Sequence, residues 1–121
     1  MNHTLGKETN LILLAAILLV LTACAGHPLQ VTPISESENP QQLINELDND
    51  IAIARKNQVN VLAPTLFKRA DNSLTAAKTD LAKGDRLSEI LGNIAGGQAQ
   101  LQRAEEISKT ARSTIPDAIK A

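Results

Sequence analysis

Two apolar seams at heptad spacing, separated by a single glycine step, constrain the fold of this chain more than any other feature. In each seam the apolar positions recur at steps of three and four residues, which places them along one face of a helix. Gly84 between the seams is typical of a helix C-terminus, because glycine adopts the left-handed backbone conformation without steric cost. The first seam consists of Phe67, Ala70, Leu74, Ala77 and Leu81, and the second of Leu87, Ile90, Ile94, Gly97, Leu101, Ala104, Ser108 and Ala111.

Folding the chain about Gly84 brings the two seams into register as an antiparallel hairpin. Phe67 then lies opposite Leu101, and Ala70 falls near Gly97. Small residues opposite small residues allow the two backbones to approach closely. The alanine-rich composition, with only one aromatic residue, also favours helices packed through aliphatic side chains.

Three glycines lie inside the second seam helix, where each costs up to about 1 kcal/mol relative to alanine. Glycines are expected in a helix where another backbone must come close, and the alternative explanation is a kink. We therefore treat these glycines as candidate positions for close packing or for contact with a partner: Gly92, Gly96 and Gly97.

A further helix is expected before the hairpin, over about 40–57. Asn39 is a favourable N-cap residue, and Pro40 suits the first helical position. Ile44 and Ile51 belong to its apolar stripe.

After this helix, residues 58–63 lose the helical period and are expected to form a packed connector. The seam helices are expected over about 64–83 and 86–113. The stretch Thr114-Ile115-Pro116-Asp117 resembles a capping box, which predicts the possible start of a fourth helix at 115. The chain then either frays or continues into something longer.

The N-terminus has the pattern of a secretory signal peptide. Lys7 precedes an uncharged apolar run of about 11 residues, whereas a helix needs about 20 to cross a bilayer. The run ends in Leu21, Thr22, Ala23 and Cys24, a tetrad that resembles the lipobox of bacterial lipoproteins. In that family the cysteine sulfur receives a diacylglycerol, the chain is cut before the cysteine, and the new amine is acylated, with fatty acids such as palmitate. The alternative is an ordinary signal peptide with a chance cysteine.

The resemblance implies three parts of the chain. Residues 1–23 would be a cleaved signal peptide, residues 24–39 a lipidated cysteine and flexible tether, and residues 40–121 a helical domain. Ala25 after the cysteine implies attachment to the outer membrane on its periplasmic face. Because the tether contains prolines and no period, we expect it to be extended and to hold the domain some tens of ångströms off the membrane.

Composition argues against several classes of function. Twelve basic residues against thirteen acidic ones leave no basic excess for binding nucleic acid. His27 is the only histidine after the signal peptide, so a histidine-based metal site or catalytic triad has no parts. We expect no enzyme activity, no cofactor and no metal.

The folded part also resembles a helical domain family of unknown function in bacterial envelope proteins. The residues that carry this resemblance are Val61-Leu62-Ala63-Pro64, the Leu-Ala-Lys-Gly-Asp of 81–85, and the run from Gln98 to Glu106. In larger members of the family the domain follows a lipobox and precedes an OmpA-like peptidoglycan-binding domain. The resemblance covers residues 52–121 and implies a scaffold rather than a catalytic site.

These patterns predict an all-α, lipid-anchored protein, built as an antiparallel helical hairpin or three-helix bundle with coiled-coil-like seams. The expected function is a structural or adaptor role in the periplasmic envelope, through helix–helix contacts with an envelope protein or with a second copy of the chain. The alternative is a small helical binding module that captures a ligand or client protein as a transport or assembly accessory.

Overall fold

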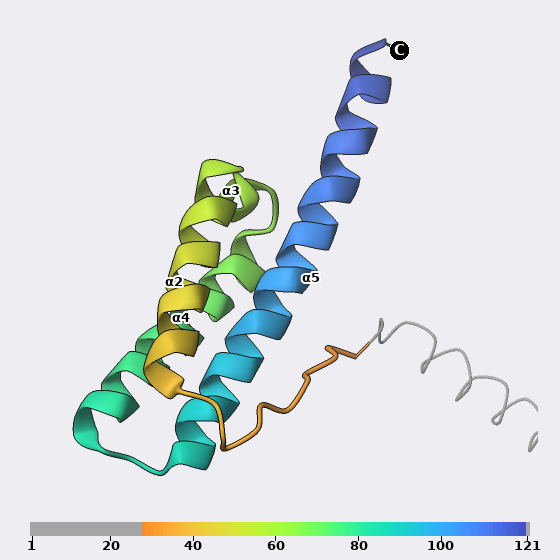
Figure 1. Cartoon of the computed structure of the whole chain (residues 1–121). Coiled ribbons are helices and arrows are strands. Elements are labelled where there is room, and N and C mark those ends of the chain that lie inside the picture. Colours follow the sequence, from red (N-terminus) through yellow and green to blue (C-terminus); the bar gives the residue numbers. More distant parts are fainter. Residues whose placement is uncertain (1–27, 121) are drawn as a thin grey trace, which may run out of the picture.

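The computed structural model describes residues 28–120, and the side-chain packing of residues 28–115. In this part of the chain the structure is helical without strands, which confirms the all-α fold class. The helices are α2 (Pro40–Lys56), α3 (Val59–Leu62), α4 (Pro64–Lys83) and α5 (Leu87–Lys120). Helices α4 and α5 form the antiparallel hairpin, α2 packs against both of them, and α3 bridges one end of the bundle (Figure 1).

The ends of α2 and α4 are set by local chemistry. At the start of α2 the side-chain oxygen of Asn39 accepts hydrogen bonds from the backbone N–H groups of Gln41 and Gln42, at 3.0 and 3.4 Å. At the end of α4, Gly84 has a φ of +74°, in the left-handed region. Its N–H bonds to the carbonyl of Leu81, and the next N–H bonds to that of Asp80, which together make a Schellman motif.

Helix α5 differs from the expected pattern at its C-terminal end. It does not stop near 113 and restart at 115, but continues unbroken to Lys120. The Thr114 hydroxyl donates to the carbonyl of Ala111 at 2.9 Å, a bond inside the helix and not an N-cap. The helix therefore continues through Pro116, although a proline inside a helix lacks the N–H for one backbone hydrogen bond and crowds the preceding turn.

The connector before α4 contains a helical turn that the sequence pattern did not predict. Gln58 has a φ of +61°, which reverses the chain after α2. The N–H groups of Val61 and Leu62 both bond to the carbonyl of Gln58, at 3.0 and 3.1 Å. A single turn is not stable alone, and here the buried Val59 attaches it to the bundle.

One hydrophobic core joins all four helices. Its largest fully buried apolar side chains, Ile44, Leu47, Ile51 and Ile94, come from α2 and α5 and meet the seam of α4. The core cluster consists of Ile44, Leu47, Ile51, Ala54, Val59, Ala63, Phe67, Ala70, Leu74, Ala77, Ile90, Leu91, Ile94, Leu101 and Ala104.

Residues 28–36, which we call the strap, run along α5 in the opposite direction to the helix (orange in Figure 1). Pro28 lies beside Arg103 and Glu106, whereas Ile34 lies beside Ser88 and partly packs on the core. The chain then turns into α2, with the N–H of Glu38 bonded to the carbonyl of Ser35 at 3.1 Å. The expected tether over 24–39 therefore does not stand off from the domain between residues 28 and 39, because α5 offers it a second apolar face.

Candidate functional site

The structure places the predicted seam residues in two environments. Leu81 and Leu87, on either side of the turn at Gly84, are half-buried. Ala111, the last predicted seam position, is half-buried as well. Buried in the core are the predicted seam positions Phe67, Ala70, Leu74, Ala77, Ile90, Ile94 and Leu101. The predicted lipidation site Cys24 and the peptidase box of Leu21, Thr22 and Ala23 lie outside the described residues.

The three glycines of α5 have different surroundings. A Cβ atom on Gly97 would lie 2.8 Å from Cδ2 of Leu47, 3.2 Å from Cβ of Ser73 and 3.5 Å from the carbonyl oxygen of Ala70. Gly97 therefore marks the point where α2, α4 and α5 cross. Close packing explains this glycine. A Cβ atom on Gly92 or Gly96 would meet nothing within 4 Å outside the local helix backbone, so packing within the chain does not require those two glycines.

A second apolar stripe of α5 lies beside the seam and under the strap, and its first residue, Leu91, also belongs to the core cluster. Leu91, Ala95 and Ala99 are buried at 3–7% exposure although none of them belongs to the seam. Their spacing of four residues was a signal that seam analysis alone overlooked. A groove of about 290 Å³ separates this face from the strap, and its lining includes Gly92.

This strap side of α5 continues as two further grooves toward the end of the helix. One of about 410 Å³ lies between Leu29 and the side chains of Arg103 and Glu106. The next, about 440 Å³, shares those two residues and extends past Ile107 to Thr110. The Arg103 guanidinium donates to the Glu106 carboxylate at 3.0 Å, so a half-exposed ion pair within α5 forms the shared boundary of the two grooves.

Three large apolar side chains remain accessible on this side of the molecule. They are Leu29 and Val31 on the strap, exposed at 39% and 48%, and Ile107 on the adjoining flank of α5, exposed at 38%. Within the strap, Ile34 is the one residue that is half-buried, by packing against the core. The strap and this flank of α5 therefore carry accessible apolar side chains that nothing within residues 28–115 covers.

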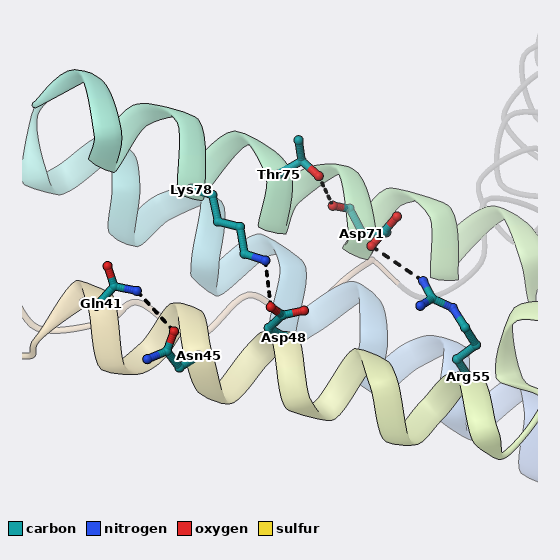
Figure 2. A network of polar contacts seen from close by, with 7 residues as sticks. All are labelled: Gln41, Asn45, Asp48, Arg55, Asp71, Thr75 and Lys78. Carbon is teal, nitrogen blue, oxygen red and sulfur yellow. Dashed lines mark hydrogen bonds and ion pairs between the residues drawn. The ribbon is translucent and has the colours of Figure 1, made fainter.

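A polar network joins α2 to α4 on a different face of the bundle (Figure 2). Lys78 on α4 reaches across to Asp48 on α2 at 2.7 Å, and the Arg55 guanidinium lies 3.9 Å from Asp71. The same guanidinium is centred 5.4 Å from the ring of Phe67. Because the four ion-pair side chains are about half exposed, we interpret the network as fixing how α2 lies on α4, not as a binding site.

Two carboxylates face each other across the junction of α2 and α5. Burial, and secondarily the nearby Asp50 carboxylate, raise the pKa of Glu105 above its usual value. The two carboxylates, Asp50 on α2 and Glu105 on α5, line a groove of about 290 Å³. The rest of its lining is Leu47, Gln98, Leu101 and Gln102. Within the described range, no three His, Cys, Asp or Glu side chains gather in an arrangement that could hold a metal ion.

Comparison with known proteins gives no match: no family model, no curated protein and no solved structure resembles this chain significantly. The similarity of residues 52–121 to the envelope domain family therefore stays a prediction from the residues quoted above. Over residues 28–120, no helix has the length and apolar character needed to span a membrane.

Proposed function

We propose that this chain is a lipid-anchored adaptor on the periplasmic face of the bacterial outer membrane, which binds a helix of another envelope protein or of a second copy. The lipobox ending at Cys24 supports the anchor and the location. The form of α5 supports the helix–helix contact.

Helix α5 is much longer than the helices that pack on it. Its 34 residues extend about 51 Å, against about 30 Å for the 20 residues of α4. The C-terminal part of α5 consequently projects beyond the rest of the bundle (Figure 1).

The apolar seam continues onto this projecting part, and this observation carries the proposal. Ser108 is the last buried seam residue; Ala111 is half-buried, and Ile115, one heptad after Ser108, is 47% exposed. Among the described helices none covers Ala111 and Ile115, and uncovered heptad positions of this kind are what coiled-coil partners recognise. The projecting end of α5 is therefore the proposed contact site.

Site-specific photo-crosslinking in cells tests this contact. A photoreactive side chain at Ile115 should give a discrete adduct with one envelope protein or with a second copy of the chain. Ile53 on α2 is the matched control, because it is also an isoleucine on a helix and is 46% exposed. Equal adducts at both positions, or none at Ile115, would contradict the proposed contact.

The anchor is tested separately by the substitution Cys24→Ser. The variant should lose incorporation of labelled palmitate, accumulate as uncleaved precursor and leave the detergent-extracted outer-membrane fraction. The wild-type protein is the control. A wild-type chain that takes up no label, and fractionates like the variant, would refute lipidation whatever the crosslinking result.

A further inference from the structure

The distance between the predicted anchor and the strap limits how far the folded domain can stand from the membrane. Four peptide steps join Cys24 to Pro28, and a fully extended chain covers at most about 3.6 Å per step, or roughly 14 Å in all. If the whole stretch of 24–39 were free, the same rule would allow about 54 Å over its fifteen steps. Because residues 28–36 lie along α5, most of that reach is lost.

The point at which the strap begins decides which side of the domain is held near the membrane. Pro28 lies beside Ala99, Arg103 and Glu106, on the side of α5 that faces away from the core. Helices α2, α3 and α4 lie on the other side of α5 (Figure 1). An anchor within about 14 Å of Pro28 therefore draws the strap side toward the lipid, with the bundle behind it.

That side also carries apolar groups that suit a bilayer surface. Among the described residues, Leu29 and Val31 on the strap and Ile107 on the adjoining flank of α5 are accessible large apolar side chains. The interfacial region of a bilayer accepts such side chains while the neighbouring polar backbone stays hydrated. The same groups are thus within reach of the anchor and compatible with its surroundings.

We propose that the strap and the flank of α5 bearing Ile107 lie against the phospholipid leaflet that holds the acylated Cys24. This inference rests on the proposed lipid anchor and adds the orientation of the domain. In this orientation the strap keeps one side of α5 close to the leaflet. The seam side of the projecting helix end, with Ile115, remains accessible to a partner.

The orientation can be measured with the mature, acylated protein in vesicles of phosphatidylethanolamine and phosphatidylglycerol. Single cysteines are introduced at Leu29, Val31 or Ile107 and labelled with a fluorophore, while the acylated Cys24 sulfur cannot react. Matched cysteines replace Ile53 and Val61, which are 46% and 68% exposed on α2 and α3. Lipids that carry a quencher at the headgroup–acyl boundary report proximity.

The expected result is strong loss of fluorescence at positions 29, 31 and 107, with little loss at 53 and 61. Equal quenching at all five positions, or stronger quenching at 53 and 61, would overturn the orientation. Mass spectrometry of the same sample separates the two proposals. A protein without a diacylglycerol on Cys24 refutes the anchor, whereas an acylated protein with the wrong quenching pattern refutes only the orientation.

A spacer variant tests the chain-length argument directly. Insertion of about ten glycine and serine residues between His27 and Pro28 adds a flexible segment that can span far more than the original four steps. Quenching at 29, 31 and 107 should then fall toward the values at 53 and 61. If the spacer leaves quenching unchanged, the short connection does not set the orientation, and the proposal is overturned.

Discussion

Replacing Gly97 by alanine should destabilise the bundle, although alanine is the better helix former. In an open helix position the exchange contributes up to about 1 kcal/mol of stability. At Gly97 the new Cβ atom would lie 2.8 Å from Cδ2 of Leu47 and 3.2 Å from Cβ of Ser73. Leu47 is 1% exposed and cannot swing into solvent, and Cβ of Ser73 is fixed to the backbone of α4.

Overpacking of this kind costs about 1–3 kcal/mol. After the gain in helix propensity, Gly97→Ala should be less stable than wild type by up to about 2 kcal/mol. The matched variant Gly92→Ala meets open space and should be more stable than wild type by up to about 1 kcal/mol. The two alanine variants should therefore differ by about 1–3 kcal/mol, with opposite signs relative to wild type.

Urea unfolding of a soluble form beginning at Gly26 measures this difference. At about 1–3 kcal/mol per molar urea, the two midpoints should be separated by roughly 1 M. In a Leu47→Ala background the penalty at Gly97 should shrink, since the closest atom has been removed. If Gly97→Ala is as stable as Gly92→Ala, the helices do not cross at this residue as described.

Three further perturbations test other parts of the structure. Phe67→Ala should cost about 3–5 kcal/mol in the same unfolding assay, because the ring is only 6% exposed; a midpoint near that of wild type would mean that the ring is solvent-accessible. A double-mutant cycle on Lys78 and Asp48 should give a coupling of only about 0.2–1 kcal/mol, and a larger value would contradict a solvated pair. Because the pKa of Glu105 is raised, the folded state binds the proton of this carboxyl more tightly than the unfolded state does. The ionised carboxylate therefore costs no folding stability below the unfolded-state pKa, and the loss of stability develops as pH rises through the folded-state pKa. Glu105→Gln should therefore raise the thermal midpoint at neutral pH and remove the part of the pH dependence that lies above the ordinary glutamate pKa; an unchanged profile would refute the assignment.

The sequence predicted the elements whose signals are local. The Asn39-Pro40 pair predicted where α2 begins, and Gly84 predicted where α4 ends. Both signals are local because helix capping depends on a few adjacent residues. The seam pattern also brought Ala70 near Gly97, since heptad spacing carries its own geometry once a turn is fixed.

The remaining features depend on tertiary contacts, which a local pattern cannot show. The turn of α3 is held by the burial of Val59, and the left-handed Gln58 before it is a residue type that rarely adopts that conformation. The strap has no period of its own, and its path is set by the second apolar face of α5. The four-residue spacing of Leu91, Ala95 and Ala99 predicts a second buried stripe on α5. It does not predict which segment of the chain buries this stripe.

The tight Schellman turn at Gly84 also affects how the protein folds. Only residues 84–86 separate α4 from α5, so closing the hairpin costs little chain entropy, and its contacts are local in sequence. The apolar stripe of α2 instead packs on a surface that α4 and α5 form together, at their crossing near Gly97. The hairpin is thus the expected folding nucleus, and α2 joins it late. For the same reason α2 is the element expected to detach first when the native protein opens locally.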